Sequence, residues 1–357
     1  MEQRKAIANR YAHLGLGVQR AIDLASIKHS TYYYHPNNKF KGKPCSTYTF
    51  RTDGKRVDND VVLQCIFDLI SPEYHDYGYH TVTQLLKRGG FVINAKKVYR
   101  MMKQSNLLHP PTRRSAGQPR QRIQYLVPPL VRPFATIEAD IKYVNIHEQN
   151  KNAYLLTLLC TFSRYALAWS LDYTMKAIHV NGLIKELLNH PYIRKYSKSQ
   201  DFKIRIRTDN GPQFIAKLLA EELQKNHIEH EFIHPATPQE NAHIESFHST
   251  VTKLVCNRNV FRNLDHAITV FSEFYEAYNN TRVMESLLYH SPKDFLIQWE
   301  NDQIAIKRNK NNKQIFFFKE ESILDSELSS SLEEYCVQNK INTFKPELFV
   351  HPEISPV

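Results

Sequence analysis

The sequence predicts an α/β protein, with small all-α units in its first third and a mixed α/β domain in the remainder. Apolar residues recur at helical spacing as far as about residue 104, and strand and helix patterns alternate from residue 134 onward. A segment with six prolines, 105–133, separates the two patterns and is typical of an extended basic linker. The charge changes at the same place, because residues 1–130 hold 21 Lys and Arg against 8 Asp and Glu, whereas residues 131–357 hold 26 against 28.

Size and composition exclude several classes of protein. A chain of 357 residues is long enough for two or three domains. It contains no run of 18 apolar residues, so no membrane span is expected, and its charged N-terminus is unlike a secretory signal. The five cysteines are scattered and never form a C-x-x-C pair. This argues against a disulfide framework or a structural zinc site and favours a reducing compartment such as the cytoplasm.

The basic charge of the first third predicts a polyanionic partner. Residues 1–130 have a net charge of +13, and no acidic residue lies between Asp76 and Glu138. A basic block of this kind attracts polyanions, of which nucleic acid is the usual one. The alternative is a basic surface that only keeps the chain in solution.

Two helical segments are predicted at the front of the chain. Residues 1–57 comprise short helices followed by a polar and basic linker over 36–57. Residues 58–104 are predicted to form three further short helices, the last of which starts at Asn94. Because that last helix is basic, the unit is typical of a helix-turn-helix that places its final helix in the major groove of DNA. Many small helical bundles share this pattern, so the signal is weak by itself.

Residues 134–298 show the element order of the ribonuclease-H-like fold. Three strands are predicted first, FATIEADIKYVNI, NAYLLTLLCTF and YALAWSL, as a meander. A helix, the strand KIRIRTD, a second helix, the short strand HEFIH and a long helix over about 240–257 follow. We therefore predict a ribonuclease-H-like core with a mixed five-stranded sheet and flanking helices. The remaining 299–357 form a tail of unknown role, in which RNKNNKQIFFFKEE is compatible with a hairpin or a strand.

Three acidic residues lie at chemically suggestive places in this core. Asp140 is inside the first strand, Asp209 ends the strand KIRIRTD, and Glu245 is on the long helix, with 35 residues between it and Asp209. Three carboxylates that converge at one sheet edge repel one another, and hard cations such as Mg²⁺ or Mn²⁺ relieve the repulsion. Two such ions activate an attacking oxygen and stabilise the leaving oxygen of a phosphodiester. The alternative is that Asp209 only shapes a turn and Glu245 is a solvated helix residue.

The residues that flank the three carboxylates resemble a known family. ATIEADIKYV, RTDNGPQF and ENAHIESFH are similar to the three catalytic blocks of DDE transposases and retroviral-type integrases. YGYHTVTQLLKRGGFVINAKKVYRMMKQ resembles the helix-turn-helix segment of second-frame (OrfB) transposases from the IS-three family of bacterial insertion sequences. FYEAYNNTRVMESLLYHSPKDF resembles the segment that closes the core of the same proteins. The match runs in the right order from about residue 10 to residue 298.

This resemblance implies a function and a set of site residues. A transposase of this type cuts DNA at the transposon ends and joins the freed 3′-hydroxyl to another phosphodiester. Asp140, Asp209 and Glu245 would be catalytic and would bind two Mg²⁺ or Mn²⁺ ions. The implied partners are double-stranded DNA (transposon ends and target), further copies of the chain on that DNA and an upstream-frame transposase protein, in the bacterial cytoplasm at the nucleoid. The expected DNA contacts are Lys96, Lys97, Arg100, Lys142, Arg164, Asn210, Gln213, His248, Lys253 and Arg282.

Two departures from the family pattern affect the expected DNA contacts. The basic residue that the family carries seven positions after the glutamate is Thr252 here, with Lys253 next to it, and the family's Cys-Trp-Asp stretch is replaced by Pro238-Gln239-Glu240. Two other functions stay open: a transposase-derived DNA-binding regulator without catalysis, and another ribonuclease-H-like nuclease. The intact carboxylates argue against the first, and the basic helical front end argues against the second.

Overall fold

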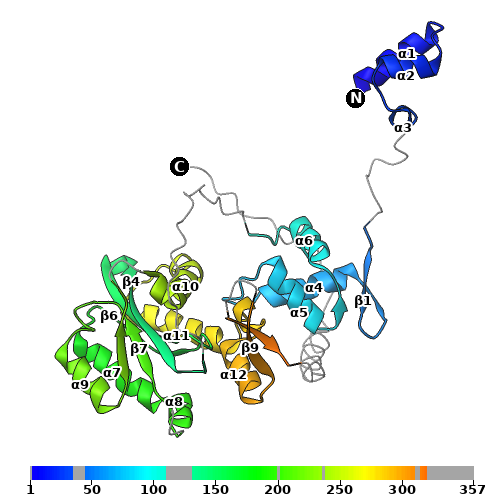
Figure 1. Ribbon diagram of the computed structural model, residues 1–357. Helices are drawn as coiled ribbons and strands as arrows, with labels where there is room; N and C mark the ends of the chain where they lie inside the picture. The colour runs from blue at the N-terminus through cyan, green and yellow to red at the C-terminus, as the bar shows by residue number, and fades with distance from the viewer. Residues whose placement is uncertain are drawn as a thin grey trace. The chain divides into compact units, whose positions relative to one another are not determined.

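The N-terminal segment folds as a small helical unit by itself. The computed structural model describes residues 2–34, 45–109, 131–198, 202–234, 238–309 and 314–319, and the chain divides into two compact units, Met1–Thr47 and Tyr48–Val357. In the first unit, α1 (Glu2–His13), α2 (Val18–Leu24) and α3 (His29–Tyr32) pack around buried apolar side chains (Figure 1). These side chains are Ala8, Ala21, Ile22 and Ile27. The short helices predicted for this segment are therefore confirmed.

The second unit begins with three helices of the predicted helix-turn-helix region. They are α4 (Asn59–Ile70), α5 (Tyr79–Arg88) and α6 (Ala95–Gln104), and their apolar faces meet in one buried cluster. Asn94 caps α6, as predicted, because its side chain accepts the N–H of Lys97 at 2.9 Å. The helical character of this region is confirmed.

A β-hairpin precedes these helices and corrects the interpretation of 36–57 as a linker. Strands β1 (Tyr48–Arg51) and β2 (Arg56–Asp58) pair antiparallel, and β1 also pairs with β3 (Phe91–Val92). Gly54 adopts a φ of 81° at the turn, a conformation that glycine reaches without steric cost. The strands are only four and three residues long and contain arginine, so they lack the apolar alternation that would have revealed them. Residues 36–44 of the expected linker lie outside the described part of the chain.

The core is a mixed sheet of five strands in the order β6-β5-β4-β7-β8. Strands β4 (Thr136–Ile146), β5 (Lys151–Cys160) and β6 (Ala166–Asp172) form an antiparallel meander. Strand β7 (Arg205–Thr208) pairs in parallel with β4, and β8 (Glu229–Phe232) pairs in parallel with β7. The predicted ribonuclease-H-like core, with its mixed five-stranded sheet and flanking helices, is confirmed.

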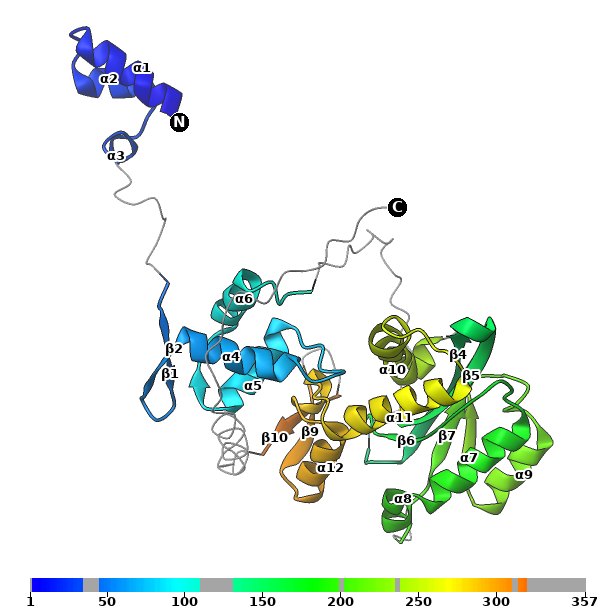
Figure 2. The same ribbon diagram turned by 180° about the vertical axis from the view of Figure 1, so that it is seen from behind.

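Helices cover both faces of this sheet, as Figures 1 and 2 show. Odd-numbered residues of β4, such as Ile137, pack with α7 (Ala177–Asn189), α8 (Pro191–Tyr196) and α9 (Lys217–Lys225). Even-numbered residues, such as Val144, pack with α10 (Ala242–Val251) and α11 (Leu264–Asn280). Side chains alternate between the faces of a strand, so the acidic residues at positions 138 and 140 belong to the face that α10 covers.

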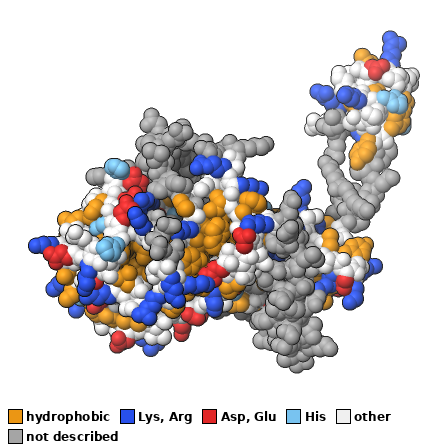
Figure 3. All heavy atoms as spheres, turned by 60° about the horizontal axis from the view of Figure 1, so that its bottom comes forward, with side chains coloured by type: hydrophobic (Ala, Val, Ile, Leu, Met, Phe, Trp, Pro, Cys, Tyr) orange, Lys and Arg blue, Asp and Glu red, His pale blue; other side chains and the backbone are white. Residues whose placement is uncertain are grey.

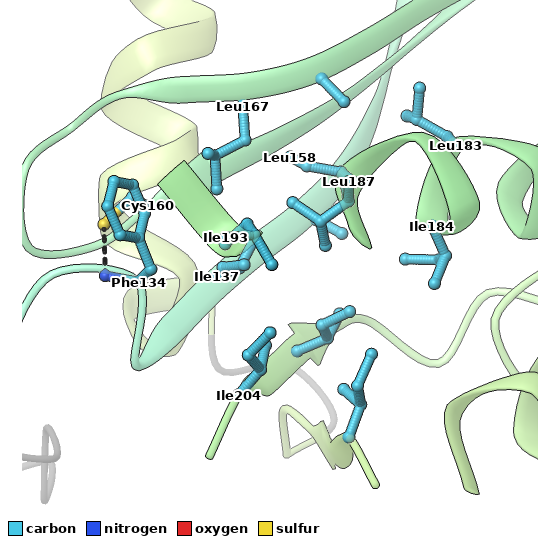
Figure 4. Packing of buried hydrophobic residues seen from close by; sticks show 14 of the residues in the cluster. Phe134, Ile137, Leu158, Cys160, Leu167, Leu183, Ile184, Leu187, Ile193 and Ile204 are labelled. Carbon is cyan, nitrogen blue, oxygen red and sulfur yellow. Dashed lines mark hydrogen bonds between the residues drawn. The ribbon is translucent and has the colours of Figure 1, made fainter. Parts of the chain in front are cut away.

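The α7 face of the sheet is a tightly filled apolar layer. Figure 4 shows side chains of α7, including Leu187, beside residues of the central strands such as Leu158. The N–H of Phe134 donates to Sγ of Cys160 at 3.3 Å. Cys160 is a free thiol, as are Cys45, Cys65 and Cys256. This packing holds β4 and β7 in place. Asp140 lies on β4, and Asp209 follows the last residue of β7.

The long helix predicted over 240–257 is present in three consecutive pieces. A 3₁₀ turn (Pro238–Asn241) leads into α10, and a π-helical turn (Thr252–Cys256) continues it. After α11 come α12 (Pro292–Glu300), β9 (Ile304–Arg308) and β10 (Gln314–Phe318), and the last two pair antiparallel. The polar run DSELSSSLEE lies outside the described residues. Within the part of the chain that the structure describes, no helix is long and apolar enough to cross a membrane.

Candidate active site

Asp140 and Asp209 are brought to the same level by the pairing of two parallel strands. Glu138 of β4 lies opposite Arg207 of β7, and the two aspartates follow two residues later on each strand, Asp209 directly after the last residue of β7. Neighbouring strands are about 4.8 Å apart, so the register sets the two aspartate backbones side by side at this edge. Oδ1 of Asp140 accepts the N–H of Ile141 at 2.8 Å, and Oδ1 of Asp209 accepts the N–H of Gly211 at 2.9 Å.

Glu245 approaches the same place from helix α10. The N–H of Ile244 donates to Oε2 of Glu138 at 2.7 Å, which fixes the start of α10 against β4. One turn beyond Glu245, Nδ1 of His248 lies 3.3 Å from Oδ2 of Asp140. Burial raises the pKa of Glu245, and the negative charge of Asp140 raises this pKa further. The strand register thus sets Asp140 level with Asp209, and the charge of Asp140 acts on Glu245 of α10.

Next to these carboxylates, Glu138 and Arg207 form a buried ion pair that the sequence analysis did not identify. Glu138 and Arg207 are almost fully buried, with Nη1 of Arg207 3.6 Å from Oε1 of Glu138. Burial raises the pKa of Glu138 to about 7, although the N–H of Ile244 and the charge of Arg207 oppose this rise. Arg207 also donates to the carbonyl of Glu240 at 2.9 Å and to Oε2 of Glu231 at 3.1 Å. The sequence feature that could have identified this pair is the spacing, because Glu138 precedes Asp140 by two residues and Arg207 precedes Asp209 by two residues.

The donor set at this edge suits a hard cation. The three carboxylates offer only oxygen ligands, which Mg²⁺ and Mn²⁺ prefer. The effect of Asp140 on the pKa of Glu245 shows that closer approach of the carboxylates is unfavourable unless a cation balances them. Among the described residues, no three His, Cys, Asp or Glu side chains are close enough together to hold an ion.

Several of the predicted DNA contacts lie at the surface. On α6, Lys96 is exposed and Arg100 half-buried, and on β4 Lys142 is half-buried. In the loop after β7, Asn210 is exposed and donates to the carbonyl of Ile233 at 3.1 Å, while Gln213 of the same loop is half-buried. Figure 3 shows one face of the molecule, on which Lys and Arg side chains are interspersed with acidic and apolar ones.

The other predicted DNA contacts bind groups of the protein itself. Nζ of Lys97 donates to the carbonyl of Tyr48 at 2.5 Å and so holds α6 to β1. Arg164 donates to the carbonyl of Thr161 beneath the sheet edge, and burial lowers its pKa. His248 is buried against Asp140, as described above, and the remaining two, Lys253 and Arg282, bind segments of the helix-turn-helix region. A basic side chain in the sequence thus does not by itself identify a DNA contact.

Asp76 is the centre of a junction between the helix-turn-helix region and the core. Its side chain is only 5% exposed and pairs with Lys253 of the π-helical turn. It also lies 2.6 Å from Nε2 of His109 and 3.5 Å from Nη2 of Arg258. Asp76 therefore contacts basic side chains from both sides of the junction. In the sequence it is also the last acidic residue before the acid-free block.

Two arginines complete this junction by binding backbone carbonyls. Arg88, at the end of α5, donates to the carbonyls of Leu288 and Tyr289 in the core. In the opposite direction, Arg282 donates to the carbonyl of Tyr74 in the α4–α5 loop. Burial lowers the pKa of both guanidinium groups. The helix-turn-helix region is therefore anchored to the segment after α11 and, through Asp76, to the π-helical turn that follows α10.

Comparison with known proteins is consistent with this arrangement. Two models of the integrase core domain match residues 131–238 and 226–292, and a model of an HTH-like domain matches residues 58–115. The chain is 25% identical over 238 residues to an uncharacterized 31.7 kDa protein of insertion element IS407 from Burkholderia multivorans, covering 67% of this chain and 81% of that protein. It is 23% identical over 254 residues to the transposase of insertion sequence element IS904 from Lactococcus lactis, covering 69% and 97%. Among solved structures, the HTLV-2 integrase catalytic core in complex with magnesium has 21% identity and a TM-score of 0.31, covering 46% of this chain and 96% of that one.

Proposed function

We propose that the chain is a DDE-type DNA transposase that cuts transposon ends and joins them to target DNA, because models of the integrase core domain and of an HTH-like domain match it and proteins of insertion elements are among its relatives. One observation carries the proposal. The register of β4 and β7 sets the backbones of Asp140 and Asp209 level, and His248, one turn beyond Glu245 on α10, faces Asp140, which supports a shared role for the three carboxylates.

Asp140, Asp209 and Glu245 are the residues that would hold the metal. Bound by these carboxylates, a pair of Mg²⁺ or Mn²⁺ ions supplies an activated attacking oxygen and charge stabilisation for the leaving oxygen. Glu138 keeps α10 on the sheet through the N–H of Ile244, so that Glu245 stays within reach of Asp140. No side chain of the site needs to form a covalent intermediate.

The reaction consists of two phosphoryl transfers. In the first, the oxygen of a water attacks a phosphodiester at the transposon end, and the bond from phosphorus to the 3′-oxygen breaks, which leaves a 3′-hydroxyl and a 5′-phosphate. In the second, that 3′-hydroxyl loses its proton and attacks a phosphodiester of the target. A new phosphorus–oxygen bond forms as the bond from phosphorus to the target's 3′-oxygen breaks, and this leaving oxygen takes up a proton to become a 3′-hydroxyl. The number of phosphodiester bonds is conserved in the second step.

The proposed partner is double-stranded DNA, bound in part by the helix-turn-helix region. The surface residues Lys96 and Arg100 of its last helix are the proposed contacts there, and Lys142, Asn210 and Gln213 those beside the carboxylates. Transposition joins two ends to one target, and one set of three carboxylates serves one strand at a time. The active species is therefore proposed to be an oligomer that forms on DNA, with an upstream-frame transposase protein as a further partner, at the bacterial nucleoid.

Replacing each carboxylate by its amide tests the proposed function. We expect Asp140→Asn, Asp209→Asn and Glu245→Gln each to abolish Mn²⁺-dependent cleavage and strand transfer with labelled transposon ends, while gel-shift affinity for DNA is retained. Glu221→Gln is the matched control, because Glu221 is an exposed residue of α9 that pairs only with Lys217 one turn away. Strand transfer at nearly the wild-type rate by any of the three variants would remove that residue from the site.

A further inference from the structure

His248 is a buried residue that faces the proposed metal ligands. It lies on α10 one turn beyond Glu245, is 8% exposed, and directs Nδ1 at Oδ2 of Asp140 over 3.3 Å. We infer that His248 is a positioning residue, which holds the carboxylate of Asp140 in the orientation that metal binding requires. The inference rests on the proposed function and assigns His248 a role other than the DNA contact that the sequence predicted.

Both oxygens of Asp140 are held from different elements. Oδ1 accepts the N–H of Ile141 from its own strand at 2.8 Å, and Oδ2 faces His248 of α10. A carboxylate held at two points cannot rotate freely about its χ2 angle. Because one of the two points is on the helix that carries Glu245, the orientation of Asp140 is coupled to the position of Glu245. Such outer contacts orient metal ligands in many proteins.

The cost of burying this histidine argues against a role in packing alone. Nε2 of His248 is buried and has no hydrogen-bond partner within the described part of the chain. A buried polar atom without a partner is unfavourable, because it loses its hydrogen bonds to water on folding. A phenylalanine would fill a similar space beside the ring of Phe247, whose centroid is 5.9 Å away, without this cost. The benefit of histidine at this position therefore lies at Nδ1, where it faces Asp140.

Two substitutions separate positioning from packing. His248→Phe keeps the aromatic bulk and removes Nδ1, whereas His248→Asn keeps a nitrogen donor at almost the position of Nδ1 and removes Nε2. We expect His248→Phe to bind Mn²⁺ about tenfold more weakly than the wild type, the lower end of the loss typical for such outer contacts, with an unchanged or higher unfolding temperature. His248→Asn should keep most of the Mn²⁺ affinity.

Titration of the full chain with Mn²⁺, followed by the electron paramagnetic resonance of the free ion, measures this affinity without cleavage. Thr250→Ala is the control, because its hydroxyl bonds only to the carbonyl of Ser246 on the outer side of α10. Wild-type Mn²⁺ affinity in His248→Phe would overturn the inference, and so would an equal loss in His248→Asn. If His248→Phe does not fold, His248→Leu replaces it with the same expectation. Loss of Mn²⁺ binding in Asp209→Asn shows that the proposed site itself binds the metal, whereas retention there refutes the proposed site rather than the role of His248.

Discussion

Replacing Asp76 with asparagine removes the carboxylate that pairs with Lys253 and Arg258 and lies beside His109 at the junction between the helix-turn-helix region and the core. The Asp76 side chain is 5% exposed, whereas those of Lys253, Arg258 and His109 are 58%, 46% and 47% exposed. Breaking a fully buried ion pair costs about 3–5 kcal/mol, and breaking an exposed one about 0–1 kcal/mol. With one partner buried and the others half in solvent, we expect Asp76→Asn to lower the free energy of unfolding by about 1–2 kcal/mol at neutral pH.

The pH dependence of this loss follows from the direction of the pKa shift. Burial raises the pKa of Asp76, but Lys253, His109 and Arg258 outweigh burial, so the net pKa is lowered. A carboxyl group with a lowered pKa in the folded state stabilises the fold above its unfolded pKa of about 3.9. That contribution disappears as the pH falls through the lower pKa of the folded state. The difference between the wild type and Asp76→Asn should therefore be full at neutral pH and should shrink below about pH 4.

Calorimetric unfolding of both proteins between pH 3 and pH 7 measures this difference. Asp53→Asn is the matched control, because Asp53 lies in the exposed turn of the β1–β2 hairpin, where asparagine can still accept the N–H of Lys55. A difference between the wild type and Asp76→Asn that is the same at both ends of the pH range would refute the ion-pair explanation. Equal losses in Asp53→Asn and Asp76→Asn would refute the importance of burial.

Two further predictions concern the site and its DNA. Gly211→Ala places a Cβ within 3.0 Å of Oδ1 of Asp209 and against the movable amide of Gln213. We therefore expect the rate of cleavage to fall several-fold with little change in unfolding temperature. An unchanged rate of cleavage would show that Asp209 adapts to the added methyl group. Lys96→Ala should weaken binding of the full chain to duplex DNA at low salt and reduce the slope of log K against log salt by about one, the share of a single phosphate contact. Lys97→Ala is its comparison, because Lys97 binds β1, and an equal change of slope in both variants would contradict the assignment of Lys96.

The regular elements of the core could be predicted from sequence because each has a strong local signal. β4, β5 and β6 are apolar runs separated by polar turns, and α11 repeats its apolar residues at helical spacing. Asp140 could be assigned to the inside of a strand and Asp209 to the end of one from local sequence, whereas the register that sets them level pairs two distant segments, β4 and β7. The β1–β2 hairpin was missed because its short polar strands gain their stability from β3, about 40 residues further along the chain.

The surroundings of the site could not be predicted, because they depend on contacts between distant segments. Arg282 resembled a DNA contact in the sequence, yet it binds the carbonyl of Tyr74, which is 208 residues away. Lys253 likewise meets Asp76, and Arg164 lies close to Glu138 beneath the sheet edge. Charge and residue type do not reveal which protein groups a basic side chain binds, because each of these partners comes from a segment distant in the sequence or across the fold.

The acceptors used by Arg88 and Arg282 have a consequence for how the protein can change during evolution. Both arginines bind backbone carbonyls, which every amino acid supplies. Leu288 and Tyr289 even adopt positive φ angles of 55° and 61° where they offer their carbonyls, so the backbone geometry is what the junction depends on. Substitutions in these accepting segments keep the acceptors in place as long as that geometry persists. The two regions can therefore diverge in side chains, and so in the DNA they recognise, while two arginines keep them joined.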